Sequence, residues 1–385
     1  MKVLVVTSLF PNQARPGLGI SVRRRTLALA KHCEVRVVAP CVGNVGPARQ
    51  EWDGVEAHYP WYPHVPKLGV LVDGPAYLAC AAPAVRRVRR GFDFDVIDSH
   101  FVYPDGFAAA WLGRMFHRPV VLTARGTDVN KLCFWWPTRA MARMALRRVD
   151  SLIAVSSALK ERMVTAGAAA DKVRVIPNGV DTTVFHPGDR QAERRALGLP
   201  LEQTVLFSAG SLIEAKGFDC LIEGLAQLPE AHAPHLYIAG PPCPYQQTLE
   251  RLAADRGVGD RVKFVGHLPP AEMPAWYRAA DFFCFGSLRE GCPNVVIEAA
   301  ACGTPVVSTT VGGIPDLVEE GRTGLLFAPR SAEGFARALG NALSRDWDRA
   351  DIAHAGSQRS WAQVAAEAHA LLERTVAKHK ERRTG

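Results

Sequence analysis

Residues 290–327 read EGCPNVVIEAAACGTPVVSTTVGGIPDLVEEGRTGLLF. Two carboxylates, Glu290 and Glu298, are separated by seven residues and flank a short loop that leads into a predicted helix. We place the N-cap of this helix at Asn294 and its end at Gly303, because these residue types favour helix starts and stops. The stretch therefore predicts a loop and a helix that together carry a pair of acidic side chains.

A predicted strand, Val306–Thr309, follows this helix and ends in a second glycine turn at Gly312 and Gly313. Backbone N–H groups that are left free at a helix start and at a glycine turn form sites for an anionic phosphate. Carboxylates beside such a site do not favour the phosphate itself, but they suit hydroxyl groups, which a sugar and a ribose both supply. The stretch therefore predicts a pocket for a sugar attached to a nucleotide diphosphate.

Outside this stretch, short β-branched runs alternate with helix-like segments, which predicts the fold class α/β. The predicted strands are 3–7, 35–39, 96–98, 120–123 and 152–155, then 204–209, 236–239, 262–265, 282–284 and 306–308. Short buried strands between helices favour parallel sheets covered on both faces. We expect two doubly wound, Rossmann-like domains facing a central cleft, with the ligand site beyond the carboxyl ends of their strands.

The predicted domain boundaries follow from composition. Residues 187–200 are polar and contain Gly and Pro, so we predict a linker there. We place an N-terminal domain at 1–187 and a C-terminal domain at 188–358. The tail, 359–385, has strong helix formers and neither Gly nor Pro between residues 360 and 380, which predicts one long helix.

Composition indicates a globular protein, with 48% apolar and 22% charged residues among 385. No run of 18 apolar residues occurs, and the N-terminal apolar run is too short for a signal peptide, so we expect a first buried strand there. The nine cysteines are scattered without a C-x-x-C pattern. This favours free thiols in a reducing cytoplasm over disulfides or a zinc site.

Positive charge is concentrated in the first half of the chain. Residues 1–187 contain 25 Lys and Arg against 14 Asp and Glu, whereas residues 188–385 contain 21 against 24. A basic half indicates an anionic partner such as nucleic acid, a lipid surface or an acidic glycan, or simply solvated helix faces. We expect no nucleic-acid partner, because no recognised binding motif occurs.

Several short motifs occur in a fixed order. They are TSLFP at 7–11, SHFVYPDG at 99–106, TARGTD at 123–128, PNGVD at 177–181, GSLIEAKG at 210–217 and FVGHL at 264–268. Together with the two glutamates and the GTPVV and VGG that follow them, they make nearly the whole chain resemble the retaining glycosyltransferases of family 4. The resemblance implies the GT-B fold, with acceptor binding in the N-terminal domain. It also implies a C-terminal helix that crosses back to the N-terminal domain.

The resemblance implies roles for the loop and helix of the C-terminal stretch. Glu290 would contact hydroxyls of the donor sugar, and Glu298 would bind the ribose. The backbone N–H groups of Gly291, Cys292 and Asn294 would join Glu290 at the donor, whereas the intervening proline has no N–H to give. The alternative for the two carboxylates is a surface loop residue and an acidic residue favoured by the helix dipole.

Lys216 would meet the diphosphate as a point charge. The family usually has an arginine five residues earlier, where this chain has Ser211. A serine hydroxyl can donate a hydrogen bond but carries no charge. The glycines Gly312 and Gly313 would supply the second anion-binding turn, with a plain turn as the alternative.

Three further sites lie in the N-terminal half. His100 ends a predicted strand, and the resemblance implies that it would touch the transferred sugar near the reacting carbon. Gly19 lies in the loop after the first strand and would bring a backbone N–H near the distal phosphate. Arg125 stands where the family commonly has histidine. With Asp128, it is a candidate for holding a phosphate or carboxylate of the acceptor.

The predicted activity is transfer of a sugar from a nucleotide-diphosphate donor to a glycan or lipid-linked acceptor, with His100, Lys216 and Glu290 as the catalytic residues. The resemblance implies retention of configuration and no metal or other cofactor, and it indicates cell-surface polysaccharide or glycolipid synthesis. The alternatives are a phosphorylase or a nucleotide-sugar hydrolase on the same fold, and a silent nucleotide-sugar binder, which Ser211 and Arg125 keep open.

An aromatic and basic segment, 133–149, combines three consecutive aromatic residues with Arg139, Arg143 and Arg147 at helical spacing. Aromatics beside a basic face suit an anionic membrane surface. We therefore predict a cytoplasmic protein that attaches peripherally to the inner leaflet. The alternative is a set of core aromatics beside a solvated basic face.

Overall fold

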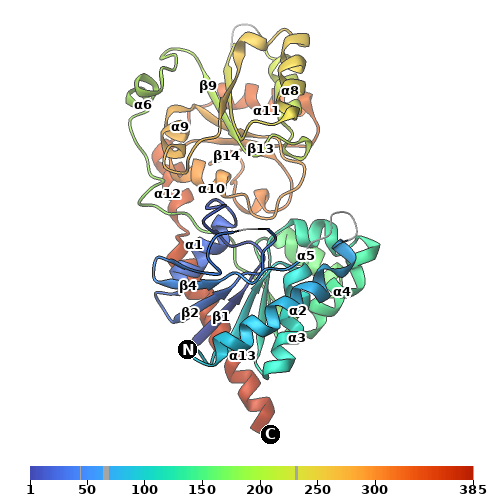
Figure 1. Cartoon of the computed structure of the whole chain (residues 1–385). Helices are drawn as coiled ribbons and strands as arrows, with labels where there is room; N and C mark the ends of the chain where they lie inside the picture. Colours follow the sequence, from blue (N-terminus) through green and yellow to red (C-terminus); the bar gives the residue numbers. More distant parts are fainter. Residues whose placement is uncertain (44, 64–68, 230–232, 385) are drawn as a thin grey trace. The chain divides into compact units, whose positions relative to one another are not determined.

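The computed structural model describes residues 1–43, 45–63, 69–229 and 233–384, and these form two compact α/β units (Figure 1). Unit 1 comprises Met1–Asn178 and the C-terminal helix α13 (Trp361–Thr384). Unit 2 comprises Gly179–Ser360. The sequence predicts divisions after residues 187 and 358, and Gly385 of the predicted tail helix lies outside the described residues.

The sheet of unit 1 has the strand order β3-β4-β2-β1-β5-β6-β7-β8. Its strands are β1 (Lys2–Val6), β2 (Glu34–Val38), β3 (Arg49–Trp52), β4 (Val55–His58), β5 (Val96–His100), β6 (Val120–Ala124), β7 (Ser151–Ala154) and β8 (Val173–Val175). Every pairing is parallel except that of β3 with β4. The parallel strands are short buried runs, because helices cover both faces of the sheet.

The antiparallel β3–β4 hairpin is absent from the predicted strands because both of its strands are polar, RQEW and VEAH. The signal that identifies it is the turn between them. Asp53 and Gly54 both have positive φ, 47° and 83°, as the Asp-Gly pair of a tight hairpin requires. The hairpin therefore forms through turn geometry at the sheet edge, without an apolar pattern.

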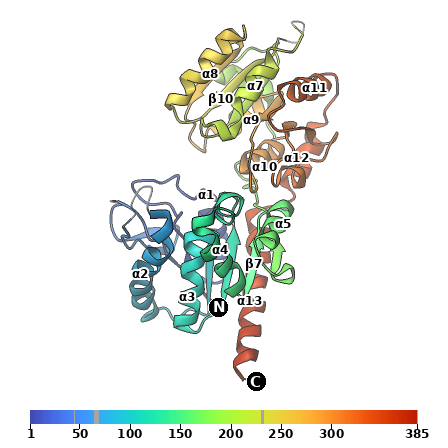
Figure 2. The same cartoon turned by 90° about the vertical axis from the view of Figure 1, so that its right-hand side faces the viewer.

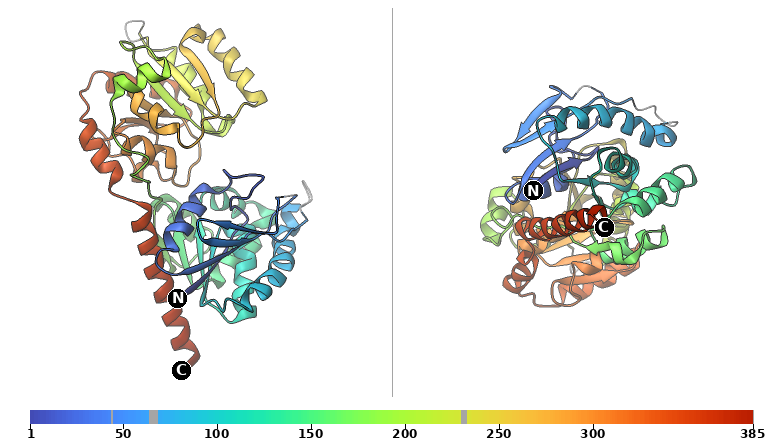
Figure 3. Two further views of the ribbon diagram at one scale, coloured as in Figure 1. Left: turned by 60° about the vertical axis from the view of Figure 1, so that its left-hand side comes forward. Right: turned by 90° about the horizontal axis from the view of Figure 1, so that it is seen from below.

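Helices cover both faces of this sheet. They are α1 (Ile20–Leu29), α2 (Gly69–Arg89), α3 (Phe107–Phe116), α4 (Trp136–Arg148), α5 (Ser157–Thr165) and α13. Helices α2, α3 and α4 lie side by side (Figure 2). Helix α13 runs along α1 and the sheet (Figure 3).

The C-terminal helix is part of the core of unit 1. Its residues Trp361, Val364 and Leu372 are buried in one apolar cluster with Val3 and Val5 of the first strand. Burying each large apolar side chain contributes about 1.5–3 kcal/mol. The predicted return of the tail helix to the N-terminal domain is confirmed.

The sheet of unit 2 has six parallel strands in the order β11-β10-β9-β12-β13-β14. The strands are β9 (Val205–Ala209), β10 (His235–Ala239), β11 (Val262–Gly266), β12 (Phe282–Phe285), β13 (Val306–Thr309) and β14 (Gly324–Phe327). Counted within the unit this is the 3-2-1-4-5-6 order of a doubly wound fold. The predicted α/β class with two parallel sheets is confirmed, and only β14 is missing from the strands predicted for this unit.

The helices of unit 2 lie on both faces of its sheet. They are α6 (Arg190–Leu197), α7 (Phe218–Leu225), α8 (Pro244–Asp255), α9 (Met273–Ala279), α10 (Asn294–Ala301), α11 (Ala332–Leu343) and α12 (Arg349–Ser357). Large apolar side chains from α7, α8 and α11 share one buried cluster with the sheet. Helix α10 packs against α9 and α12. Within the described residues, no helix combines the length and apolar content needed to cross a bilayer.

The predicted linker at 187–200 is wrong, because this segment contains helix α6. Asp189 caps the helix by accepting hydrogen bonds from the N–H groups of Gln191 (2.9 Å) and Ala192 (3.1 Å). Gly198 ends it in the left-handed conformation. The polar composition reflects a capped helix that Arg194, only 2% exposed, anchors to the end of α9 and to the loop before β9 by hydrogen bonds to Ala279 and Leu201.

Candidate functional site

In each sheet the connections leave two adjacent strands in opposite directions. Doubly wound folds bind ligands beyond the carboxyl ends of these two strands, and we call this place the switch position. In unit 2 these strands are β9 and β12, and in unit 1 they are β1 and β5. The loops beyond their carboxyl ends carry most of the predicted site residues. Each unit is therefore described from these loops upward.

Lys216 and Glu290 meet at this position in unit 2. The Lys216 ammonium donates a hydrogen bond to Oε1 of Glu290 at 2.7 Å, and the Ser287 hydroxyl donates to the same oxygen at 2.7 Å. The side chains of Lys216 and Glu290 are 25% and 11% exposed. Two residues 74 positions apart thus form a partly buried ion pair beyond the carboxyl ends of the central strands β9 and β12.

Glycines bring the backbone of three loops together around this pair. Gly217 has φ +63°, and a Cβ placed there would lie 2.0 Å from the carbonyl oxygen of Gly286. Gly312 has φ +57°, and a Cβ there would lie 2.1 Å from the carbonyl oxygen of Glu290. Only glycine fits either position, so the Gly312-Gly313 turn lies directly against the loop that carries Glu290.

The loop after β12 leads into α10 with one difference from the predicted helix start. The N-cap is Pro293, whose φ of −73° and ψ of 115° are extended, and Asn294 is the first helical residue. Proline has no side-chain acceptor for the N–H groups of the first turn. Cys292, just before this helix start, is 8% exposed.

Glu298 consequently lies at the start of the second turn of α10, one residue further along the helix than the predicted N-cap at Asn294 implies. Its side chain is 8% exposed, and Oε2 accepts a hydrogen bond from the hydroxyl of Tyr277 at 3.2 Å. Ser211 lies on the loop between β9 and α7 that also carries Lys216, and it is exposed. The two predicted carboxylates, Lys216 and the Gly312 turn are thus all in unit 2 and beyond the carboxyl ends of its strands.

A Gly312→Ala substitution tests the contact between these loops. We expect it to weaken binding of the predicted nucleotide-sugar donor by at least roughly ten-fold, because the methyl group has to displace the Glu290 carbonyl in addition to the 1–2 kcal/mol cost of a left-handed alanine. Gly257→Ala is the matched control, since Gly257 has φ +72° and no atom within 4 Å of its Cβ position. Equal ligand affinity of the two variants in a calorimetric titration contradicts the assignment.

In unit 1, His100 ends β5 and its ring is fully buried. A guanidinium nitrogen of Arg125 lies 3.1 Å from Nδ1 of His100. Because arginine can only donate, Nδ1 accepts and the ring proton is on Nε2. Burial, together with Arg125 and Arg25, holds the pKa of His100 well below its ordinary value of 6.5. His100 is therefore a neutral ring beneath Arg125, rather than an exposed group at the end of the strand.

An ion pair that the sequence analysis did not identify lies beside His100. Arg25 of α1 donates to both carboxylate oxygens of Asp98, at 2.9 and 2.8 Å, and to the hydroxyl of Thr123 at 2.6 Å. Both charged side chains are almost completely buried, at 3% and 1% exposure. A lone aspartate inside the apolar strand VIDSH is the sequence signal that indicates it.

Asp128 holds the loop after β6 in place. It is buried and accepts hydrogen bonds from the backbone N–H groups of Val102 (2.9 Å), Gly126 (2.7 Å) and Arg125 (3.2 Å). Burial raises the pKa of Asp128 and these N–H groups oppose that rise. The side chain of Arg125 also donates to Asn178 Oδ1 at 2.9 Å. Asp128 thus positions the backbone of the arginine rather than facing a ligand.

Gly19 precedes α1 in the left-handed conformation, with φ 65°. A Cβ there would lie 2.1 Å from the carbonyl oxygen of Leu9, so the loop after β1 folds back on itself at this glycine. The same loop contacts the loop after β5, because the hydroxyl of Ser8 donates to Asp105 at 3.0 Å. Gly19 therefore lies in a loop beside the switch position of unit 1.

The buried neutral His100 has a consequence for acid stability. Below about pH 6.5 the unfolded chain binds a proton at this ring that the folded chain excludes, so His100 makes unit 1 less stable as the pH falls. When the pH falls from 6 to 5, the free energy of unfolding should decrease less in His100→Gln than in the wild type, by up to about 1.4 kcal/mol.

Urea unfolding of both proteins at the two pH values measures this difference. The pKa of buried Asp105 is raised to about 7, so this residue makes the folded state more stable as the pH falls through this range. Its contribution is the same in wild type and variant and cancels in their difference. His117→Asn, at an exposed left-handed position that asparagine tolerates, is the control. An unchanged pH dependence for His100→Gln contradicts the buried neutral ring.

No group of three or more His, Cys, Asp or Glu side chains with the arrangement of a metal site occurs among the described residues. The nine cysteines are all free thiols. Burial raises the pKa of several, for example Cys133 to about 12.

Two family models match the chain. The model "Glycosyltransferase Family 4" matches residues 16–184, and "Glycosyl transferases group 1" matches residues 189–359. Together the two matches cover nearly all of the chain between residues 16 and 359.

Three curated relatives illustrate the similarity. A D-inositol 3-phosphate glycosyltransferase of Corynebacterium aurimucosum is 33% identical over 317 residues, covering 76% of this chain and 75% of the relative. The protein of the same name from Acidothermus cellulolyticus is 37% identical over 202 residues, and this match spans about half of each chain, 49% and 45%. The putative teichuronic acid biosynthesis glycosyltransferase TuaC of Bacillus subtilis is 29% identical, with 88% of both chains covered.

Solved structures show the same fold. Sucrose-phosphate synthase from Thermosynechococcus elongatus superposes with a TM-score of 0.82 at 21% identity, covering 98% of this chain and 100% of that one. HepE of Anabaena in complex with UDP-glucose superposes with a TM-score of 0.70 at 21% identity, covering 100% and 99%. The motifs, the two doubly wound sheets and the sequence matches agree, and the chain belongs to the group 1, family 4 glycosyltransferases.

Proposed function

We propose that this chain transfers a sugar from a nucleotide-diphosphate donor to a glycan or lipid-linked acceptor, with retention of configuration and without a metal. The observation that carries the proposal is the Lys216–Glu290 ion pair at the switch position of unit 2, enclosed by two glycine-dependent loop contacts. The structure of HepE with UDP-glucose supports a donor of this class, since that protein has the same fold.

The ion pair suits the anionic diphosphate and the sugar hydroxyls that a nucleotide sugar presents. An ammonium has three N–H groups, and the contact with Glu290 uses one of them, so Lys216 can also donate to a diphosphate. The leaving diphosphate gains negative charge in the transition state, and a fixed cation beside it lowers the barrier. Glu290 would accept hydrogen bonds from sugar hydroxyls, and Glu298 from the ribose.

Unit 1 supplies the acceptor side in this proposal. Arg125 is held between His100 and Asn178 at the carboxyl ends of the strands, where it would orient an anionic acceptor group. His100 would act through Arg125, because its ring is buried beneath that side chain. The similarity to TuaC, whose name refers to teichuronic acid biosynthesis, supports a role in the synthesis of a cell-surface polymer.

A measurement of donor binding and product tests the proposal. UDP-, GDP- and ADP-sugars are screened for an increase in melting temperature, since a ligand of the native state raises it. The stabilising donor is then incubated with candidate acceptors, and the anomeric configuration of the product is read by NMR. Release of sugar phosphate, release of free sugar only, or inversion at the anomeric carbon each contradicts the proposed reaction.

We also propose that unit 1 attaches to an anionic membrane surface through the segment at the start of α4. Phe134, Trp135 and Trp136 are 41%, 39% and 79% exposed, which favours a surface role over the alternative of core aromatics. The arginines of α4, Arg139 and Arg143 among them, follow directly in the sequence. Exposed aromatics beside cations suit the interface of an anionic leaflet.

Flotation with vesicles tests this attachment. We expect the wild type to float with vesicles that contain anionic lipid, and Trp135→Ser/Trp136→Ser to reduce the bound fraction at least about five-fold, because two interfacial indoles are lost. Val184→Ser, at an exposed apolar position of unit 2, is the control. Equal binding to neutral and anionic vesicles, or equal binding of the two variants, contradicts the attachment.

A further inference from the structure

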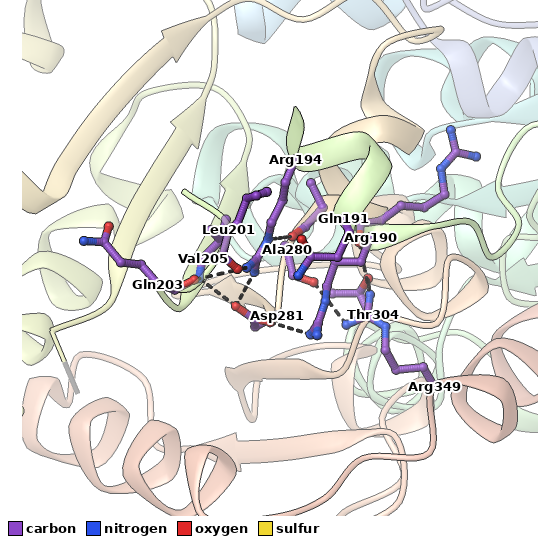
Figure 4. Close-up of polar contacts among 12 residues, drawn as sticks. Arg190, Gln191, Arg194, Leu201, Gln203, Val205, Ala280, Asp281, Thr304 and Arg349 are labelled. Carbon is purple, nitrogen blue, oxygen red and sulfur yellow. Dashed lines mark hydrogen bonds and ion pairs between the residues drawn. The ribbon is translucent and has the colours of Figure 1, made fainter. Parts of the chain in front are cut away.

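A cavity of about 410 Å³ lies at the amino end of the sheet of unit 2. Thr204, Asp281 and Pro305 line it, and they directly precede β9, β12 and β13. The predicted donor site lies beyond the opposite ends of the same strands. We call this cavity the amino-end pocket, and Figure 4 shows the polar contacts of its wall.

The wall contains three guanidinium groups, and two of them share one carboxylate. Arg190 and Arg194 of α6 each contact Asp281, at 2.6 and 2.5 Å (Figure 4). Arg349, the first residue of α12, lines the same cavity. Asp281 also accepts from the backbone N–H of Val205 at 2.7 Å, so this carboxylate is fully engaged in the framework of the sheet.

The three arginines differ in how many donors they have left. Arg194 is committed to the fold, because its guanidinium also donates to the carbonyl oxygens of Ala279, Leu201 and Gln203. The guanidinium of Arg190 makes a single hydrogen bond to the described residues, to Asp281, although it has five N–H groups. Its side chain is 42% exposed.

Arg349 lies in this wall without a carboxylate of its own in the part of the chain that the structure describes. It donates to the carbonyl oxygens of Ala280 (3.1 Å) and Arg278 (3.4 Å), and to the hydroxyl of Thr304 (2.9 Å). Burial, together with the positive charges of Arg190 and Arg194, lowers the pKa of Arg349 to about 10. The wall thus holds more positive charge than its own acidic residue neutralises.

The rim of the cavity adds a fourth arginine and two acids. Arg345 lines the pocket, is exposed, and makes no ion pair with any described residue. Glu202 and Asp346 also line it, and both are exposed to solvent. The lining thus has four arginines against three acidic residues, and water screens the exposed carboxylates, so the pocket remains attractive to an anion near the more buried Arg349.

We infer that the amino-end pocket binds a phosphate group, held by the guanidiniums of Arg190, Arg345 and Arg349. Guanidinium groups match phosphate oxygens with paired, charge-assisted hydrogen bonds. The volume exceeds what inorganic phosphate fills and lies within the range of sites for small ligands, which favours a phosphorylated small molecule. Such a ligand would join α6 to α12 and stabilise unit 2.

Trp347 gives a local readout, because it lines the pocket and packs edge-to-face against Phe282 at 6.2 Å. The 385-residue chain, which has eight tryptophans, is labelled with 5-fluorotryptophan, and the ¹⁹F resonance of Trp347 is assigned with Trp347→Phe. Inorganic phosphate and a hexose phosphate are titrated separately at constant ionic strength. We expect a saturable shift of the Trp347 resonance. Saturation at a lower concentration of hexose phosphate identifies an organic ligand, and saturation at equal concentrations identifies the phosphate alone.

Arginine variants decide whether the shift reports this pocket. Arg190→Gln/Arg345→Gln should raise the apparent dissociation constant roughly ten-fold or more, since charged hydrogen bonds are lost. Arg345→Gln alone, which breaks no ion pair among the described residues, gives the same direction should the double variant fold poorly. Arg337→Gln, at an exposed position of α11, is the matched control.

Lys216→Gln separates this pocket from the predicted donor site, and it should leave the Trp347 shift unchanged. The inference is overturned by any of three results. One is a Trp347 resonance that does not respond to phosphate, and another is a response equal to that produced by chloride. The third is a response that persists undiminished in the arginine variants.

Discussion

Glu290→Ala should reduce sugar transfer by about 10²–10³-fold in kcat/KM, the cost of removing one fixed polar group from a charged transition state. The loss has two sources. The carboxylate that would hold the sugar hydroxyls disappears, and Lys216 loses the partner that orients its ammonium at 2.7 Å. Steady-state kinetics with the donor identified by thermal stabilisation measures the effect.

A second substitution separates these two sources. Glu290→Gln keeps an oxygen that accepts from a hydroxyl, but it removes the negative charge that pairs with Lys216. Glu333→Ala is the control, because Glu333 is an exposed glutamate of the same unit on α11. Full activity of Glu290→Ala, with unchanged circular dichroism and melting temperature, eliminates Glu290 from the site.

Asp98→Ala should destabilise unit 1 by about 3–5 kcal/mol, because it leaves the guanidinium of Arg25 buried without a counter-charge. The two hydrogen bonds of 2.9 and 2.8 Å from Arg25 to Asp98 are lost together. Urea unfolding measures the change, and the transition of unit 1 must be followed separately because two units need not unfold as one.

Two controls accompany this measurement. Asp93→Ala removes a carboxylate that is 64% exposed and pairs with Arg89 and Arg118 at the surface, so it should cost at most about 1 kcal/mol. Arg25→Met/Asp98→Leu removes both buried charges and should recover most of the stability lost in Asp98→Ala. A cost for Asp98→Ala no greater than that for Asp93→Ala contradicts the buried pair.

The sequence predicts the parts of the fold that local pattern determines. The parallel strands follow from short apolar runs, and the α10 start follows, within one residue, from the loop that leads into it. The two polar elements, helix α6 and the β3–β4 hairpin, are not predicted, because they do not depend on an apolar pattern. Helix α6 depends on capping by Asp189 and on the tertiary bonds of Arg194, and the β3–β4 hairpin depends on the turn at Asp53.

In the candidate site too, residue types and spacing are predicted, whereas contacts that depend on tertiary packing are not. Residue types and spacing indicate Lys216 and Glu290 as neighbours of a diphosphate sugar, but their direct ion pair depends on which strands are adjacent in the sheet. For His100, the strand end is predicted, whereas its burial beneath Arg125 is a property of the packed loops. The Arg25–Asp98 pair is missed because it joins helix α1 to strand β5 across 73 positions of sequence, which depends on tertiary packing and not on a local pattern.

Helix α13 imposes an order on the assembly of the chain during translation. The helix follows unit 2 in the sequence, yet it covers the apolar surface of a strand that is synthesised well before it, which includes Val3 and Val5. Unit 2 is continuous in sequence, so it can fold during translation. The N-terminal part of unit 1 keeps this apolar surface exposed until α13 has been synthesised. A message truncated before codon 361 therefore yields a chain whose unit 1 lacks α13, and this unit exposes an apolar surface that chaperones can bind.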